Sequence, residues 1–490
     1  MLPEAIYSQY ETVIGLEVHC QLQTNSKIFA NDANQFGNEA NTNISVITLA
    51  HPGTLPRVNK RAIEFAVKMG LACGSDITQS TYFDRKNYFY PDLPKGYQVS
   101  QDKKPICLGG GVTVKLKNTE NKGFTNKFIP FHHIHLEEDA GKSIHDFNAT
   151  NTVLDYNRAG TPLIEIVSDP CITSGEEAAA YLTEIRQLVR FLGICDGNME
   201  EGSMRADLNV SVRKHGVKTL GTKVEIKNMN SIRNLQRAAE HEQRRQIEAL
   251  ESGEGLIQET RGFDADSGTT YGMRIKETMN DYRYFPEPDL APIVLTDEWV
   301  ANLKTTIPAL PRQLVEKYTN IFGLTLYDAE QITESKEMAD YFEKAITFNQ
   351  NYKLISNWLT STIRGFLNDN NLAINKLKLS PARLAEIIAL IESDLISSST
   401  AAQKLFPAML ENPEQLAKSL AESNNWLQQS NTDTLQTLID EVLAAYPDKV
   451  QEYQKGKKGL IGFFVGEVMK KSKGSADPKI TNQLVANALA

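Results

Sequence analysis

Residues 12–23, near the start of the chain, combine two side chains that can do chemistry. At the two-residue period of a strand, the apolar residues share one face, while Glu17 and His19 share the other. Gly15 lies beside them and leaves room for a ligand or a second backbone. A carboxylate next to an imidazole is typical of part of a metal or phosphate site. The pattern is equally typical of the solvated face of an antiparallel sheet.

Further segments repeat this pattern of isolated acids on strand faces or at strand ends. Their polar side chains are Arg205 and Asp207, then Lys223, Glu225 and Lys227, and the acids Glu137, Glu138 and Asp139. Two carboxylates about 4 Å apart repel by ~4 kcal/mol at an effective dielectric of 20, so several acids that converge need a cation. Carboxylate oxygens suit magnesium, which commonly bridges protein acids to nucleotide phosphates. Taken singly, each acid is equally typical of a solvated strand position.

The chain has no glycine-rich phosphate loop. Gly141-Lys142-Ser143 resembles the end of a Walker loop, but Leu136 stands where its first glycine should be. Phosphate groups would therefore be bound by separate cationic side chains. The candidates are Arg85, Lys86, Arg158, Arg205, Lys223, Lys227, Arg274 and Lys276. A group of histidines at 132, 133, 135 and 145 matches no standard zinc spacing and is interpreted as part of a surface strand.

Composition and charge are those of a globular protein. A length of 490 residues predicts two or three domains. The formal net charge of -9 argues against general coating of nucleic acid, so RNA contacts would need local basic patches. Five scattered cysteines without a C-x-x-C pair fit a reducing compartment. Because we find neither a targeting segment nor an apolar run long enough to span a bilayer, we expect a cytoplasmic protein with no membrane partner.

The character of the chain changes near residue 298. Before that point, short β-rich segments alternate with helices predicted at 61–71, 176–192 and 231–251. From residue 299 to 490, Leu, Ala, Lys, Glu and Gln recur at helical spacing. We therefore predict an α+β protein, in which a mixed α/β domain built on a largely antiparallel sheet precedes an all-α region.

Eight motifs, in order along the first domain, resemble the B-type subunit of the aspartyl/glutamyl-tRNA amidotransferases. They are VIGLEVH, SKIF, DRKNYFYPD, HLEEDAGKS, DYNRAGTPLIEIV, EEGSMRADLNVSVR, GTKVEIKNMNS and DYRYFPEPDL. The segment KGKKGLIGFFVG resembles the YqeY-like C-terminal region of that family. The resemblance implies a catalytic cradle domain at 1–298, a helical domain at 299–410 and a YqeY-like helical tail at 411–490, whose similarity could begin near residue 341.

The resemblance implies an ATP-dependent amidation of a carboxylate carried by tRNA. The side-chain carboxylate of Glu-tRNA(Gln) and/or Asp-tRNA(Asn) would be phosphorylated with ATP and Mg2+, because a carboxylate is a poor electrophile and phosphate is a good leaving group. Ammonia from a separate amidase subunit would then displace the phosphate, and a third, small subunit would join the two larger ones. This chain has no S-G-G-S-type amidase loop, which fits that division of labour.

Site residues follow from the resemblance together with the strand patterns. The expected metal ligands are His19, Glu138 and Glu225, with Glu138 preferred to Glu137 on the alignment of its motif. The expected catalytic residues are Glu17, Lys86, Glu138 and Asp207, and the expected phosphate-binding residues are Arg158, Arg205, Lys223 and Arg274. For tRNA, the candidates are Lys455, Lys457, Lys458, Lys470 and Lys471, although an ordinary solvated lysine face has the same pattern.

Two other functions fit parts of the pattern. A free-standing amine ligase acting on a small carboxylate would need no partner subunits and no basic tail. A non-catalytic RNA-binding scaffold would tolerate replacement of Glu17, His19, Glu138 and Glu225 without chemical loss.

Overall fold

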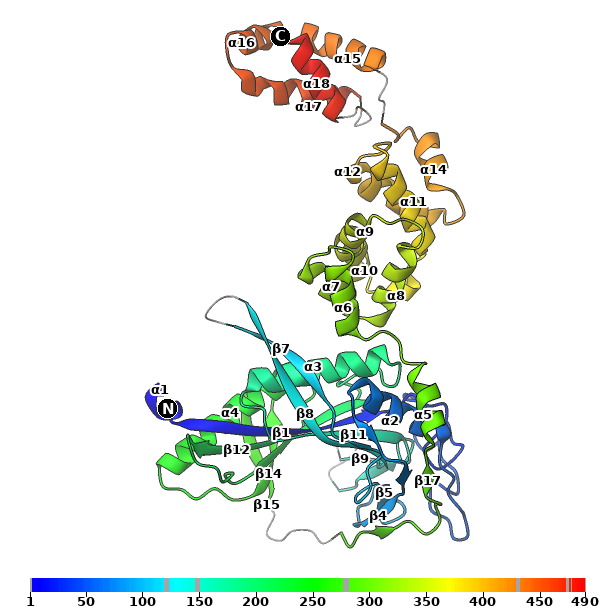
Figure 1. Ribbon diagram of the computed structural model, residues 1–490, viewed down its shortest axis with the longest axis vertical. Helices are drawn as coiled ribbons and strands as arrows, with labels where there is room; N and C mark the ends of the chain where they lie inside the picture. Colours follow the sequence, from blue (N-terminus) through cyan, green and yellow to red (C-terminus); the bar gives the residue numbers. More distant parts are fainter. Residues whose placement is uncertain are drawn as a thin grey trace. The chain divides into compact units, whose positions relative to one another are not determined.

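The computed structural model describes residues 2–118, 123–145, 150–275, 282–428, 432–472, 476 and 478–489. The chain divides into two compact units, Met1–Leu310 and Pro311–Ala490. The first unit is built on a large sheet with helices, and the second is helical (Figure 1). The predicted fold class, α+β with a largely antiparallel sheet before an all-α region, is confirmed. The predicted subdivision of the helical region at residue 410 stays a prediction.

One large sheet organises the first unit. Its strands, in spatial order, are β15 (Thr269–Ile275), β14 (Glu259–Asp264), β13 (Val224–Lys227), β12 (Met204–Lys214), β1 (Tyr10–Gln21), β11 (Pro162–Ser168), β8 (Phe124–Glu138), β5 (Tyr97–Ser100), β4 (Asp84–Asn87) and β16 (Phe285–Pro286). Along this path only β13 and β14 pair in parallel. Off the path lie β2 (Asp76–Ile77), β6 (Cys107–Leu108) and β7 (Gly111–Lys117). Two small pairs are β9 (Lys142–Ile144) with β10 (Val153–Asp155), and β3 (Ser80–Thr81) with β17 (Ile293–Val294).

Strand β1 lies in the middle of the sheet, between β11 and β12, and pairs antiparallel with both. Its alternating apolar residues Ile14, Leu16 and Val18 are at most 1% exposed and belong to the main core. That core includes apolar side chains of the helices α3 (Gly175–Phe191) and α4 (Ile232–Glu251), which lie along the sheet (Figure 1). One face of β1 is therefore buried against helices, so its other face is available for a site.

Most helices of the first unit begin at a residue whose side chain caps the helix. They are α1 (Glu4–Tyr7), α2 (Lys60–Ala72), α3 (Gly175–Phe191), α4 (Ile232–Glu251) and α5 (Asp297–Lys304), and of these α1 alone lacks a capping side chain. Ser174 Oγ accepts a hydrogen bond from the Glu177 backbone N–H at 3.1 Å, and Ser231 Oγ accepts one from Asn234 at the same distance. These contacts satisfy amide groups that a helix start leaves without partners. The helices predicted at 61–71, 176–192 and 231–251 are confirmed within a residue or two.

The second unit contains short helices, most of which bury apolar residues. They are α6 (Pro311–Asn320), α7 (Leu326–Ile332), α8 (Lys336–Ala345), α9 (Tyr352–Trp358), α10 (Arg364–Asp369), α11 (Pro381–Glu392), α12 (Ser398–Thr400), α13 (Phe406–Glu411), α14 (Ala417–Ser423), α15 (Thr432–Ala445), α16 (Pro447–Gln454), α17 (Ile461–Lys471) and α18 (Pro478–Ala488). The helices from α15 onward share a core of their own, which includes Leu435, Phe464 and Val485. Within the described residues, no helix combines the length and apolarity that crossing a membrane requires.

Candidate active site

Antiparallel pairing brings acids from distant parts of the sequence onto one face of the sheet. His19 of β1 lies opposite Glu165 of β11, and Glu165 lies opposite His135 of β8. On the other side of β1, Glu17 lies opposite Asp207 of β12. Side chains of directly paired residues point to the same face of a sheet. The strand register therefore gathers these acids and imidazoles on the face of β1 away from the main core.

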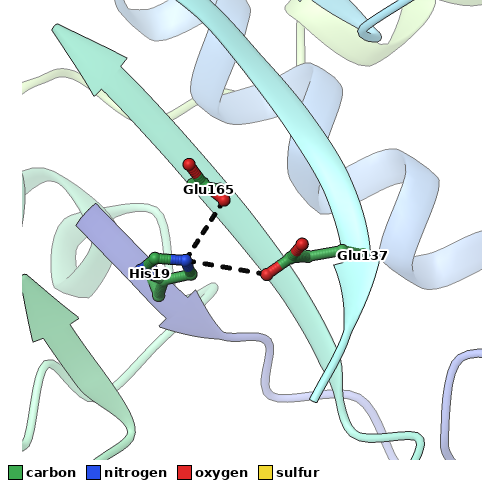
Figure 2. Close-up of side chains that lie close together, drawn as sticks. All are labelled: His19, Glu137 and Glu165. Carbon is green, nitrogen blue, oxygen red and sulfur yellow. Dashed lines mark ion pairs between the residues drawn. The ribbon is translucent and has the colours of Figure 1, made fainter. Parts of the chain in front are cut away.

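Three residues form a first group, which we call the His19 group: His19, Glu137 and Glu165. Figure 2 shows the two carboxylates, from β8 and β11, converging on the imidazole of β1. His19 Nε2 lies 3.1 Å from Glu165 Oε2 and 3.7 Å from Glu137 Oε1. The ring of His135 supports the same acids, with its Nε2 at 3.4 Å from Glu165 Oε2 and 3.6 Å from Glu137 Oε2. One ligand atom from each member of the group lies within 4.8 Å of the others.

The charges of the His19 group stabilise one another. Burial of the His19 ring opposes its protonated form, but Glu165 and Glu137 outweigh this effect and raise the pKa of His19 to about 9. Burial likewise opposes the charged form of Glu165, but His19 and His135 outweigh it and lower the pKa of that carboxyl. In the absence of a metal ion, the protonated imidazole is therefore the cation between the two carboxylates.

A second group, the Glu17 group, contains only acids: Glu17, Asp207 and Glu225. One carboxylate oxygen from each lies within 4.8 Å of the others. Asn209 Nδ2 donates to Glu17 Oε1 at 3.0 Å, and Thr260 Oγ1 donates to Glu225 Oε2 at 2.8 Å. Burial, together with the charges of Glu165 and Asp207, raises the pKa of Glu17. This rise is expected for a buried carboxylate that lies beside other acids.

Both groups line one open cavity of about 700 Å³, which we call the site cavity. Lys86, Arg205 and Lys227 line it as well. Lys86 Nζ lies 5.0 Å from the ring centre of Tyr282, and its charge contributes to the lowered pKa of Glu165. Oxygen-rich groups at this spacing fit Mg2+, which takes few protein carboxylates and keeps room for water and phosphate. Cations around the same cavity suit a polyphosphate.

Glu138 does not lie beside His19, where the sequence placed it. The carboxylate of Glu138 forms an ion pair with Lys95 and accepts a hydrogen bond from the Val99 backbone N–H at 2.8 Å. It lines a different cavity of about 130 Å³, which we call the Lys95 cavity. Successive residues of a strand point to opposite faces, so only one of Glu137 and Glu138 can reach His19. The structure places Glu137, and not Glu138, beside His19, and the expected metal-binding role of Glu138 stays a prediction.

The expected phosphate-binding residues are dispersed. Arg205 lines the site cavity and donates to both oxygens of Asp139 at 3.0 Å. Arg158 donates to the carbonyl oxygens of Ala140 and Gly141, so it holds the turn after β8. Lys223 is exposed and lines a third cavity. Arg274 belongs to β15, but its side chain lies outside the described residues.

Sequence reasoning missed three contributors to the site. Glu165 is a single acid within the otherwise apolar strand β11, and this interruption of the apolar run was the sequence feature that could have indicated a site residue. His135 and Glu137 lie two residues apart on β8, which is the same spacing as that of Glu17 and His19 on β1. His135 is buried at 7% exposure against the acids, so the interpretation of this histidine as part of a surface strand is wrong.

The five expected tRNA-binding lysines lie in the C-terminal part of the second unit, and all five are exposed. Some already have acidic or aromatic neighbours. Lys457 Nζ lies 3.1 Å from Glu452 Oε2, and Lys458 Nζ lies 4.2 Å from the ring centre of Tyr453. No described contact assigns an RNA role to any of them, so that role stays a prediction.

Comparison with known proteins gives two family matches and many whole-chain relatives. Residues 12–301 match the family described as the GatB/GatE catalytic domain, and residues 340–489 match the one described as the GatB domain. The B-type subunit of the aspartyl/glutamyl-tRNA(Asn/Gln) amidotransferase of Gloeothece citriformis is 47% identical over 489 residues, which cover 99% of this chain and 98% of the relative. This chain belongs to the GatB/GatE family. The same subunit of a Nostoc species is also 47% identical, and that of Crocosphaera subtropica 46%, both with the same coverage.

Membership of the GatB/GatE family confirms the predicted protein class, a B-type subunit of a tRNA-dependent amidotransferase and hence a ligase of translation. The catalytic-domain match includes the His19 group and the Glu17 group. The second match includes the candidate tRNA-binding lysines.

Proposed function

We propose that this chain phosphorylates, with ATP, the side-chain carboxylate of glutamate or aspartate carried by tRNA(Gln) or tRNA(Asn), and then directs its amidation. The observation that carries the proposal is the pair of groups around His19 and Glu17, which line one cavity together with three cations. Two neighbouring cation sites beside positive side chains suit the transfer of a phosphoryl group between two anionic molecules.

The His19 group and the Glu17 group would each hold one Mg2+. When bound, Mg2+ supplies positive charge that offsets the charge on the transferring phosphoryl group. Lys86 and Arg205 hold further positive charge at the wall of the same cavity. Arg205 is kept in place by its two hydrogen bonds to Asp139. These side chains would hold the substrate carboxylate and the phosphates so that a carboxylate oxygen can attack the phosphorus opposite the leaving oxygen.

The nucleoside of ATP is assigned to the third cavity, of about 240 Å³, next to Glu17. Apolar side chains such as Val13, Leu16 and Leu220 line it, and Lys223 stands at its edge. Asn209 also lines this cavity, and none of the described residues donates a hydrogen bond to its buried Oδ1. An adenine amino group could supply that hydrogen bond. Because Glu17 lines both cavities, phosphates extending from such a nucleoside would reach the site cavity.

Ammonia from an amidase partner would need a route that excludes water. The Lys95 cavity is assigned to this route because it shares Asp139 with the site cavity. Lys27 lines it and has a side chain with 0% exposure. Burial lowers the pKa of Lys27 to about 8, partly offset by Asp32, so a fraction of this amine is neutral near physiological pH.

The partners follow from the reaction. An amidase partner supplies ammonia, a small linker protein joins the complex, and exposed lysines of the tail contact the tRNA backbone. A cytoplasmic location, where tRNA is charged and used, is part of the same proposal.

The decisive experiment combines this chain with amidase and linker subunits, mischarged tRNA, ATP and Mg2+. We expect phosphate release and amide formation that depend on all components. A free-standing ligase would instead amidate a small carboxylate without the partner subunits. An RNA-binding scaffold would bind tRNA but release no phosphate, and either result would replace the proposed function.

A further inference from the structure

Lys227 places an ammonium group inside the Glu17 group. It forms an ion pair with Asp207, and its Nζ lies 3.2 Å from Glu225 Oε1. Glu225 and Lys227 share one face of β13, and β13 pairs with β12, which carries Asp207. The Lys227 side chain is 37% exposed and lines the site cavity, so it reaches the two acids from the open side.

This ammonium occupies the position that a divalent ion would need. The Glu17 group consists of three carboxylates, and Lys227 contacts two of them. A charged lysine donates hydrogen bonds and cannot ligate a metal, and it repels a divalent ion held by the same oxygens. The two cations therefore exclude each other at Asp207 and Glu225.

The His19 group differs in this respect. Its ion-pair partners among the described residues are the imidazoles of His19 and His135, and a ring nitrogen can itself be a metal ligand, which an ammonium group cannot. No described lysine forms an ion pair with Glu137 or Glu165. The His19 group can therefore take a metal ion without moving a side chain out of the way, whereas the Glu17 group cannot.

We propose that Lys227 is an internal cation that fills the Glu17 group until a divalent ion arrives with the nucleotide. This inference rests on the proposed function, because it takes the two groups to be cation sites. The long side chain of Lys227 can turn into the cavity, where nucleotide phosphates accept its hydrogen bonds. The chain would then bind one divalent ion alone and a second only together with a nucleotide.

The test is a Mn2+ titration of the full chain without nucleotide. Binding is monitored by calorimetry and by the electron paramagnetic resonance signal of free Mn2+. We expect one tightly bound ion in the wild-type chain. Lys227→Met should bind two ions, and its affinity for the second ion should be about tenfold or more higher than that of the wild type. Adding a non-hydrolysable ATP analogue should give the wild-type chain its second ion.

Two further variants make the titration decisive. Lys227→Gln retains a hydrogen-bond donor and replaces Lys227→Met if that variant unfolds. Lys127→Met removes a lysine that pairs with Glu177, outside both groups, and should bind Mn2+ as the wild type does. A wild-type chain that binds two ions without nucleotide, or Lys227→Met and Lys227→Gln variants that bind only one, would overturn the role of Lys227. If the wild-type chain binds none, and Glu137→Gln changes nothing, the cation sites themselves and the proposed function fail.

Discussion

Glu137 and Glu138 are neighbours in β8, yet their carboxylates lie in different cavities. Glu137 Oε1 lies 3.7 Å from His19 Nε2 in the site cavity, while Glu138 pairs with Lys95 on the other face of the strand. Both residues are buried, at 4% and 3% exposure. The strand thus separates the His19 group from the Lys95 cavity by the thickness of one backbone, and we expect the two acids to have separate roles.

The first prediction separates these two roles. Glu137→Gln removes a charged oxygen from the His19 group and should weaken the first bound Mn2+ by about tenfold or more. Glu138→Gln should leave this affinity unchanged, because its carboxylate does not face His19. Calorimetric titration of both variants checks the prediction. Equal losses in the two variants would contradict the assignment of Glu137.

The second prediction concerns Thr260 of β14, which donates a hydrogen bond to Glu225 at 2.8 Å. Thr260→Val keeps the shape of the side chain but removes one hydrogen bond that orients Glu225. In the presence of a nucleotide analogue, the second Mn2+ should bind about 10-fold more weakly, in line with other residues that orient metal ligands. Thr113→Val, a matched change on β7, should have no effect. Unchanged binding in Thr260→Val would show that Glu225 needs no such support.

The third prediction is that binding of the first metal ion depends on pH. The pKa of His19 is raised to about 9, so below that pH the ring carries a proton that a metal ion must displace. Apparent Mg2+ affinity should therefore rise by up to about tenfold per pH unit as the pH increases from 7 to 9. Calorimetry in two buffers of different ionisation enthalpy should detect about one proton released per ion. His19→Gln should bind weakly and lose this pH dependence.

The fourth prediction concerns stability and Lys27. Burial lowers the pKa of Lys27 from 10.5 to about 8, so between these values the unfolded chain binds a proton that the folded chain has lost. More protons in the unfolded state mean that the free energy of unfolding rises with pH, by up to about 1.4 kcal/mol per unit from this group. Lys27→Met should lack this rise when unfolding is compared at pH 7.5 and 9.5. Lys60→Met, at an exposed position, should follow the wild type.

The fifth prediction concerns the C-terminal lysines. Lys455→Glu with Lys457→Glu should weaken tRNA binding by the assembled complex and lower the salt dependence of the binding constant, by about one unit of log–log slope for each lost phosphate contact. Lys376→Glu with Lys418→Glu changes the same charge at exposed positions outside the candidate set. Filter binding at several salt concentrations compares the pairs, and equal effects would remove the tail from the tRNA interface.

Local sequence patterns were sufficient to predict several helices and strands and part of the candidate site. Alternation in β1 predicted that Glu17 and His19 share a face, and helical spacing predicted α3 and α4. These features depend on residues at most a few positions apart, so the sequence displays them directly. The eight motifs likewise indicated the family through the order of their residues alone.

The partners of those residues depended on the tertiary structure. Glu165 meets His19 because β11 pairs with β1, across more than a hundred residues of chain, and that register depends on the burial of whole strand faces. Glu137 and Glu138 are adjacent acids on β8, and a shift of one residue in the pairing of β8 with β11 would exchange the faces to which they point. Their order in the sequence therefore does not say which of them faces His19. The sequence by itself determined which side chains share a strand face. Only the packing of the sheet against its helices decided which faces point into the site, because that depends on apolar contacts between segments far apart in the chain.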